Sequence, residues 1–325
     1  MSSKPVTVAQ AAGMLRQADR VLILMHQYPD GDTIGCGYAL CRALQAMGKT
    51  ARTACSDVIP KKYDYMTAGV PQPDFEPAFI VAVDVADPKL LGKYLEPLAG
   101  KVDLCIDHHG SNKEYAQYLL LDAASAATAM LIAQVIRELG VELDQGMAEC
   151  LYTGIATDTG CFKYANTDAA AHRMAAEMME CGVRAEMINR EMFDVKSRAR
   201  VELERMALDR MEFHCGGRVA FMTITNEMAQ ASGATENDME GLAPIPRQIE
   251  GVWVGVTLRQ KADGSFKVSV RTGTHADASA VCAQLGGGGH MRAAGCSPQG
   301  DAAAVIRQLL DAIRRTVPHV DETNG

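Results

Sequence analysis

The stretch VLILMHQYPDGDTIG, residues 21–35, decides the fold of the first half of the chain. Its first five residues are all apolar, which is typical of a strand that is buried on both faces. A polar loop follows, and the apolar residues between Ile34 and Met47 recur at helical spacing until Gly48 ends the pattern. A buried strand that leads directly into a helix predicts a parallel sheet covered by helices.

The same alternation continues through the first half of the chain. The segments 79–83, which is wholly apolar, and 102–106, which is apolar except for Asp103, predict two further buried strands. Helical patterns lie beyond them at 125–139, 145–157 and 168–181. We therefore predict an α/β fold whose N-terminal domain is built on a parallel sheet.

The second half of the chain has a different pattern, which begins after a charged, helix-forming stretch that we interpret as a connecting helix at 194–211. Three strand patterns and then two helical patterns follow, at 218–225, 251–259, 266–271, 277–285 and 302–316. They predict a smaller, mixed α/β domain. The predicted organisation is a domain at 1–190, a linker helix at 191–215, a second domain at 216–318 and a frayed tail at 319–325.

The composition excludes several classes of protein. Of the 325 residues, 48% are hydrophobic and 22% are charged, which is globular composition, and the length suits about two domains. The formal net charge of −8 argues against binding of long duplex nucleic acid. Ten cysteines occur without a Cys-x-x-Cys pair, so we expect neither a zinc ribbon nor a disulfide framework. We find no signal-peptide pattern and no apolar run of membrane-spanning length, and we expect a soluble, cytoplasmic protein.

Residue types that bind metals are concentrated in four short segments of the first half. Three of these segments follow predicted strands, and ligands of open parallel sheets bind outside the carboxyl ends of the strands. The residues are His26, Asp30, Asp32, Asp84, Asp107, His108, His109 and Asp158. The fold itself would therefore bring these side chains together.

Each segment has an ordinary structural explanation when it is considered alone. Asp32 could be a helix N-cap, Asp84 could be a turn residue, and Asp158 could end a helix. A single histidine such as His26 is more often a hydrogen-bonded core residue than a ligand. The adjacent histidines at 108–109 are harder to explain in this way. All of these explanations must hold together for the cluster to be inert, and we therefore favour a functional site.

The charge of the cluster predicts divalent cations. Asp30, Asp32, Asp84 and Asp158 would carry four negative charges that repel one another, and two divalent ions would cancel them. Carboxylates and imidazoles without thiolates suit Mn²⁺ or Mg²⁺ better than structural zinc, although Zn²⁺, Co²⁺ and Fe²⁺ stay open. Two such ions close together suit attack on a phosphorus centre.

The glycines Gly31, Gly35 and Gly37 offer a competing interpretation as a dinucleotide-binding loop. Their spacing differs from Gly-x-Gly-x-x-Gly. Asp30 and Asp32 would also repel a pyrophosphate in that loop unless metal ions lay between them. We reject this interpretation.

Several segments together resemble the motifs of the DHH phosphoesterase superfamily, and they follow one another in the same order as in that superfamily. They are HQYPDGDTIG (26–35), VAVDVAD (81–87), IDHHGSN (106–112) and GIATDTG (154–160), followed by KVSVRTG (267–273) and QLGGGGHMRAAG (284–295). The last two resemble the DHH-associated domain of the short, two-domain members. Within the superfamily, the chain is most similar to bacterial oligoribonucleases (nanoRNases) that also dephosphorylate 3′-phosphoadenosine 5′-phosphate (pAp).

The resemblance implies roles for individual residues. One metal ion would be held by His26, Asp30 and Asp84, and the other by Asp32, Asp84, His108 and Asp158, so that Asp84 would bridge them; in this family the ions are usually Mn²⁺. Asp107 would orient an imidazole, and His109 would face the phosphate as a proton donor or charge stabiliser. Substrate would be held by residues of the second domain, namely Arg271, Gly287, Gly288, Gly289 and His290.

Elementary chemistry supports an anion-binding role for the glycine run. Backbone amides without neighbouring Cβ atoms can approach an anion closely, and a helix that starts near Met291 would add its dipole. The alternative is a flexible loop between helices.

The resemblance implies a two-metal phosphohydrolase that cleaves short oligoribonucleotides to mononucleotides, or pAp to AMP and phosphate. The alternatives are a cyclic-di-AMP or linear dinucleotide phosphodiesterase, a family-II inorganic pyrophosphatase, and a catalytically silent nucleotide-binding protein. The expected partners are short single-stranded oligoribonucleotides or small nucleotides, with no long duplex and no membrane. A homodimer is the expected oligomeric state.

Overall fold

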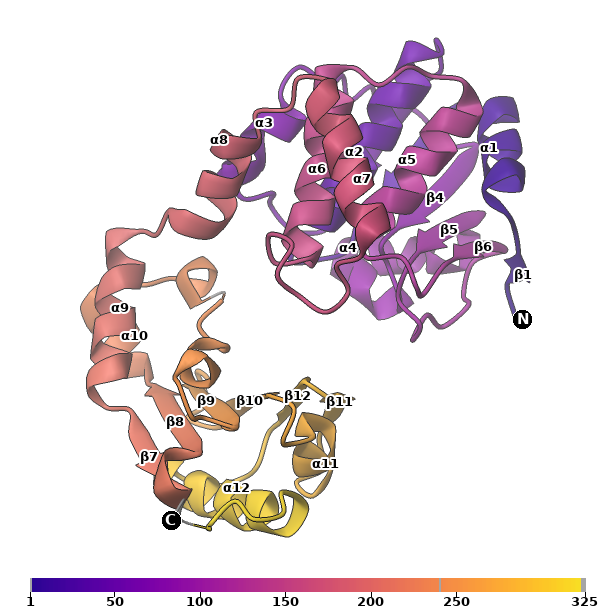
Figure 1. Cartoon of the computed structure of the whole chain (residues 1–325). Helices are drawn as coiled ribbons and strands as arrows, with labels where there is room; N and C mark the ends of the chain where they lie inside the picture. The colour runs from indigo at the N-terminus through magenta and orange to yellow at the C-terminus, as the bar shows by residue number, and fades with distance from the viewer. Residues whose placement is uncertain (1, 240, 323–325) are drawn as a thin grey trace. The chain divides into compact units, whose positions relative to one another are not determined.

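A computed structural model describes residues 2–239 and 241–322, and the chain divides into two compact units, at 1–195 and 196–325 (Figure 1). Each unit is built on its own six-stranded sheet. Within the described residues, every helix is too short or too polar to cross a membrane.

The first unit contains a sheet in which all neighbouring strands are parallel. Its order is β1-β6-β5-β4-β2-β3. The strands are β1 (Lys4–Pro5), β2 (Val21–Leu24), β3 (Ala51–Ala54), β4 (Phe79–Val83), β5 (Leu104–Asp107) and β6 (Tyr118–Leu121). Because β5, β4 and β2 are neighbours and run the same way, their carboxyl ends lie side by side at one edge of the sheet.

Both faces of this sheet are covered, as the apolar runs predict. Val21 and Ile23 of β2 belong to the larger core, whereas Leu22 and Leu24 belong to a second core on the opposite face. The larger core is built with α1 (Val8–Gln17), α2 (Gly31–Ala46), α5 (Thr128–Leu139), α6 (Gln145–Asp158) and α7 (Ala169–Glu180). The second core lies under the short segments η2 (Pro88–Leu91), α4 (Gly92–Leu95) and η3 (Glu96–Lys101). The unit also contains the helices α3 (Asp64–Thr67) and α8 (Ala185–Asn189) and the short segments η1 (Lys61–Tyr63) and η4 (Arg190–Asp194).

Glycines allow α2 and α6 to pack backbone against backbone. A Cβ atom on Gly35 would lie 2.3 Å from the carbonyl oxygen of Cys150, and one on Gly154 would lie 2.5 Å from Asp32 Oδ1. The close approach places Asp32 between α6 and the start of α5. Gly31, Gly35 and Gly37 all lie within α2, where they serve helix packing.

The second unit contains a mixed sheet with the order β11-β12-β10-β9-β8-β7, in which only β8 and β9 pair in parallel. The strands are β7 (Glu212–His214), β8 (Val219–Ile224), β9 (Val254–Gln260), β10 (Phe266–Thr272), β11 (Gly288–His290) and β12 (Ala293–Cys296). The helices are α9 (Arg198–Asp209), α10 (Asn226–Ser232), α11 (Ala278–Ala283) and α12 (Ala302–Thr316). One core lies between the sheet and α11 and α12, and a smaller one lies under α9 and α10.

The α/β fold predicted from the sequence is confirmed, and two local predictions are wrong. No helix begins near Met291, because Met291 and Arg292 form the turn between the paired strands β11 and β12. Residues 319–322 are not frayed. Arg218 donates a hydrogen bond to the carbonyl of His319 and Val320 is buried, so this segment is anchored to the unit. The predicted tail at 323–325 lies outside the described residues.

Gly35→Ala should destabilise the first unit, because the added methyl group would force α2 away from α6. We expect a loss of about 1–3 kcal/mol, the usual cost of overpacking. Gly13 of α1 is the matched control, since a Cβ atom there would meet no atom within 4 Å. Gly13→Ala should stabilise the protein by up to about 1 kcal/mol through helix propensity. Urea unfolding followed by circular dichroism measures both effects, and equal behaviour of the two variants would contradict the packing argument.

Candidate metal centre

The predicted site residues of the first unit come from the carboxyl edge of its sheet and from two helices. His26 lies two residues beyond β2, Asp84 directly follows β4, and Asp107 is the last residue of β5. Asp30 is the N-cap of α2, and Asp158 is the last residue of α6. The order of the sheet brings these ends together.

One group of possible ligand atoms contains His26, Asp30 and Asp84. Their atoms lie within 4.8 Å of one another. His26 Nε2 is 3.5 Å from Asp30 Oδ1 and 3.6 Å from Asp84 Oδ2. These separations leave room for one small cation between the three side chains.

A second group contains Asp32, His108 and Asp158, again within 4.8 Å. His108 Nε2 is 3.1 Å from Asp158 Oδ2 and 3.9 Å from Asp84 Oδ1. Asp84 also forms a group with His108 and His109. The two carboxylate oxygens of Asp84 therefore face different groups, which is the arrangement that a bridging ligand needs.

The backbone at Asp84 aims this carboxylate. Asp84 has φ of 59°, in the left-handed region that residues other than glycine seldom occupy. Its side chain is 4% exposed, and its Oδ1 accepts a hydrogen bond of 2.8 Å from the Thr128 hydroxyl. Such strained conformations persist where the surrounding structure enforces them, often at functional sites.

Backbone carbonyls fix the tautomer of two histidines. His26 Nδ1 lies 2.8 Å from the carbonyl oxygen of Gln27, and His108 Nδ1 lies 3.0 Å from that of Ser125. A carbonyl only accepts, so Nδ1 must carry the proton in both rings. The neutral rings then direct the Nε2 lone pair at carboxylates, and only a proton or a metal ion makes that contact favourable.

Asp107 has a different role from the other aspartates. Its Oδ1 accepts hydrogen bonds from the amides of His108 and His109 and from His109 Nδ1, the last at 2.8 Å. Its Oδ2 accepts one from the Asn112 amide at 2.6 Å. Asp107 thus holds the loop and orients His109, whose imidazole is 44% exposed.

The pKa values show how strongly negative the site is. Burial and the charges of Asp84 and Asp158 raise the pKa of Asp32 well above its usual range. Burial alone would lower the pKa of the histidines, but the carboxylates of Asp30 and Asp84 raise that of His26 to about 11. Asp158 and Asp32 similarly raise the pKa of His108 to about 10. Because these pKa values are raised, the cluster binds protons tightly, and divalent ions can replace those protons.

The donor set fits hard or intermediate divalent metal ions. It consists of carboxylate oxygens and imidazole nitrogens. The nearby Cys36 donates its thiol to Asp32 Oδ1 at 3.4 Å, and burial raises its pKa well above the usual range. None of the candidate ligand groups among the described residues contains a cysteine, which argues against a thiolate zinc site.

Sequence reasoning did not identify the residues that support the ligands. Thr128 binds Asp84, Asn112 binds Asp107, and the carbonyl of Ser125 orients His108. Their residue types are common in turns and helix starts. The motif IDHHGSN includes Asn112, and this was the one available sequence signal.

The predicted substrate-binding residues of the second unit share one end of its sheet. Arg271 of β10 pairs with Ala293 of β12, which in turn pairs with His290 of β11. Residues that are directly opposite in neighbouring strands project from the same face, so Arg271 and His290 lie on one face of the sheet.

The glycines beside His290 differ in their surroundings. A Cβ atom on Gly287 would lie 2.2 Å from the Gly295 carbonyl, and Gly289 has φ of 146° and packs against Ala294. A Cβ atom on Gly288 would meet nothing within 4 Å. Packing therefore explains Gly287 and Gly289, whereas it does not explain Gly288.

Comparison with known proteins agrees with this geometry. Residues 20–155 match the model of the DHH family, N-terminal domain, and residues 216–317 match the DHHA1 domain. The bifunctional oligoribonuclease and PAP phosphatase NrnA of Thermus thermophilus is 36% identical over 90% of this chain and 89% of its own length. The protein of the same name from Bacillus subtilis is 22% identical over 86% of this chain and 89% of its own.

Among solved structures, an exopolyphosphatase-related protein from Bacteroides fragilis has a similar fold. It superposes with a TM-score of 0.87, covers 97% of each chain and is 22% identical. The two domain matches lie in the two separate units, in the order predicted from the sequence motifs. The chain therefore belongs to the DHH family of phosphoesterases and carries a DHHA1 domain after its DHH domain.

Proposed function

We propose that this protein is a two-metal phosphohydrolase that cleaves short oligoribonucleotides to mononucleotides and converts pAp to AMP and phosphate. The observation that carries the proposal is the pair of ligand groups on either side of Asp84. The similarity to the Thermus protein spans nearly the whole chain, so both domains support the same activity. We propose Mn²⁺ as the metal, because the family resemblance implies it and the carboxylate and imidazole donors are compatible with it.

We propose separate roles in metal binding and proton transfer for the residues of the first unit. His26, Asp30 and Asp84 would hold one ion, and Asp32, Asp84, His108 and Asp158 the other. When bound, two such ions supply a nucleophilic water at neutral pH and stabilise charge on the phosphoryl oxygens. His109, oriented by Asp107, would present Nε2 to a phosphate oxygen or to the leaving group.

We propose that the DHHA1 domain, at 216–318, binds the substrate. Arg271 and His290 lie on the same face of its sheet, two strands apart, and a guanidinium and an imidazole on one face suit the binding of phosphate groups. Gly287, Gly288 and Gly289 would let backbone amides approach that phosphate. The domain at 1–190 would perform the chemistry, and 191–215 would connect the two. We also propose that the protein acts on single strands and forms a homodimer.

The substrate proposal is tested by a panel assayed side by side with Mn²⁺. The panel contains pAp, pApA, cyclic-di-AMP, a five-nucleotide RNA and the same RNA in a duplex. We expect hydrolysis of pAp and of the single-stranded RNA. A preference for cyclic-di-AMP would favour the alternative suggested by the more distant similarity to the cyclic-di-AMP phosphodiesterase GdpP of Geobacillus thermodenitrificans. Nucleotide binding without turnover would instead indicate a silent binding protein.

Asp84→Asn should abolish nearly all activity, because one neutral amide would replace the carboxylate that faces both ligand groups. The amide oxygen can still accept from Thr128, and asparagine tolerates the left-handed conformation, so the variant should fold. Mn²⁺ titration by calorimetry should show weaker binding and fewer bound ions than in the wild type. Asp168→Asn is the control, since Asp168 only caps α7 and asparagine caps equally well. Wild-type turnover in Asp84→Asn would refute the bridging role.

Gly288→Ala should raise KM for pAp about ten-fold, equivalent to about 1.4 kcal/mol, by keeping the phosphate away from the backbone. Its thermal unfolding should match the wild type, because the methyl group would point into open space. Gly287→Ala should instead lower the melting temperature, since its Cβ atom would collide with β12. Steady-state kinetics and scanning calorimetry separate the two effects. An unchanged KM in Gly288→Ala would argue against phosphate binding at this glycine.

A further inference from the structure

The loop that carries His26 and Asp30 also holds an aromatic ring in solvent. Tyr28 is 79% exposed and has φ of 54°, a strained conformation for a bulky residue. Its amide donates a hydrogen bond of 2.8 Å to Asp57, which fixes the backbone in this conformation. A large apolar ring that is held out of the core beside a metal centre is available to bind a ligand.

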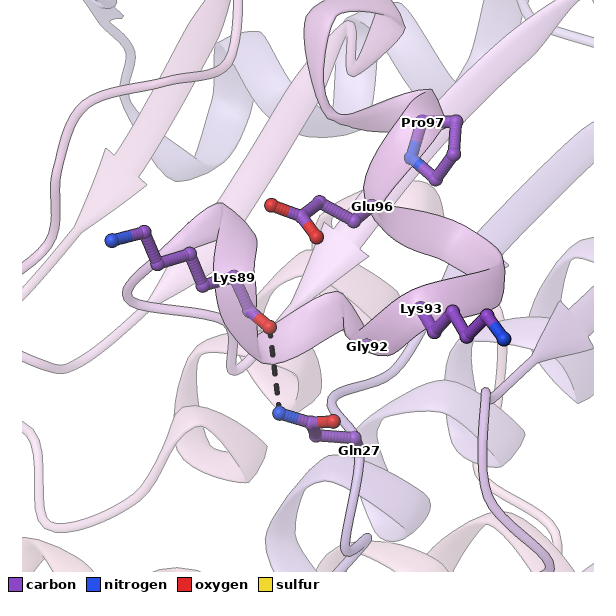
Figure 2. Close-up of a pocket in the computed structure, with 6 residues that line it drawn as sticks. All are labelled: Gln27, Lys89, Gly92, Lys93, Glu96 and Pro97. Atoms are coloured by element: carbon purple, nitrogen blue, oxygen red, sulfur yellow. Dashed lines mark hydrogen bonds between the residues drawn. The ribbon is translucent and has the colours of Figure 1, made fainter.

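Gln27, the residue before Tyr28, is one of the residues that line a surface pocket of about 530 Å³. Gln27, Lys89, Gly92, Lys93, Glu96 and Pro97 line it (Figure 2). Figure 2 shows the side chains of Lys89 and Lys93 extending toward opposite sides, with Gln27 below the segment that carries them. We call this the lysine pocket.

The lysine pocket is tied directly to the metal-binding loop. The Gln27 amide donates to the carbonyl of Leu90 at 2.6 Å, and the Gln27 side chain donates to the carbonyl of Lys89 at 3.4 Å. From the other side, the Ser56 hydroxyl donates to the carbonyl of Leu91 at 2.6 Å. The pocket is thus held one residue from His26.

The charge of the lysine pocket is opposite to that of the metal centre. Two ammonium groups and the carboxylate of Glu96 give it a net charge of +1, in a chain whose net charge is −8. Lys93 lies next to a second exposed ring, because its Nζ is 5.9 Å from the ring centre of Tyr94, which is 73% exposed. Exposed rings interleaved with lysines are typical of single-stranded nucleic-acid binding.

We propose that the lysine pocket and the rings of Tyr28 and Tyr94 form a subsite for further nucleotides of a single-stranded oligoribonucleotide. Lys89 and Lys93, whose side chains extend toward opposite sides, bind different phosphodiesters that are not hydrolysed, and the rings stack on bases. The inference rests on the proposed function and extends it. The subsite acts on substrates longer than one nucleotide, whereas pAp ends at the metal centre.

The double variant Lys89→Ala/Lys93→Ala tests the phosphate contacts. We expect the ratio of kcat/KM for a five-nucleotide RNA to kcat/KM for pAp to fall about ten-fold. KM for the RNA should also depend less steeply on salt, because fewer counterions are released. The control is the double variant Lys4→Ala/Lys101→Ala, which removes the same charge from a pocket at the amino ends of the strands of the first sheet. It should leave the ratio of the two kcat/KM values unchanged.

Tyr28→Gly tests the ring without straining the fold. Glycine favours the left-handed conformation at this position, so the variant should be at least as stable as the wild type. We expect about five-fold weaker binding of a fluorescein-labelled five-nucleotide RNA, measured by anisotropy. Tyr28→Phe keeps the ring and should bind like the wild type.

The outcomes separate this inference from the proposed function. An unchanged ratio in the lysine variant, or an equal loss on pAp and RNA, would overturn the subsite. Wild-type affinity in Tyr28→Gly would overturn the stacking role. Failure of the wild-type protein to hydrolyse both pAp and RNA would instead overturn the proposed function itself.

Discussion

The structure of the first unit depends on how its fold stabilises several carboxylates that lie close together and are largely buried. Asp32 is fully buried and Asp84 is 4% exposed, so water can stabilise neither charge. The fold supplies partial compensation from its backbone. Asp32 accepts hydrogen bonds from the amides of Thr128 at 2.7 Å and Ala129 at 2.9 Å, at the positive end of α5. The raised pKa of Asp32 shows that this compensation is incomplete, which leaves a demand for cations.

The same strand ends produce two kinds of aspartate. Asp107 ends β5, and both of its oxygens are occupied by its own loop and by Asn112. Asp84 ends β4, and its left-handed backbone turns the carboxylate away from local amides toward the two histidine-containing groups. Position at the sheet edge is therefore insufficient to define a ligand. The local conformation decides whether a carboxylate stabilises a loop or faces a cation.

Residue patterns predicted the central strands β2, β4 and β5, because the segments 21–25 and 79–83 are wholly apolar and 102–106 is apolar except for Asp103. They did not predict β1, which has two residues and contains a proline, or β3, in which Arg52 and Thr53 interrupt the apolar pattern. They also did not predict β6, although it is apolar and as long as β2. The glycine run predicts a loop that leads into a helix, whereas residues 288–290 form the edge strand β11, because glycine has no strong preference and pairing with β12 defines the strand. The individual ligand roles stay predictions, although the structure places the named side chains within reach of one another. Thr128 and Ser125 lie far from the motifs in sequence, so only the tertiary fold reveals their contacts.

An aspartate of this site can stabilise the fold and face a cation at the same time. Asp30 caps α2, since its Oδ1 accepts from the amides of Asp32 and Thr33, and it also faces His26. The sequence also allows Asp32 as the cap of this helix, but its carboxylate instead binds the start of α5 and faces His108. A carboxylate has two oxygens with about four lone-pair positions, so amides can occupy some of these positions while a cation occupies another. Helix capping thus fixes these carboxylates before any ion arrives, and a pre-positioned ligand set loses little entropy when it binds metal.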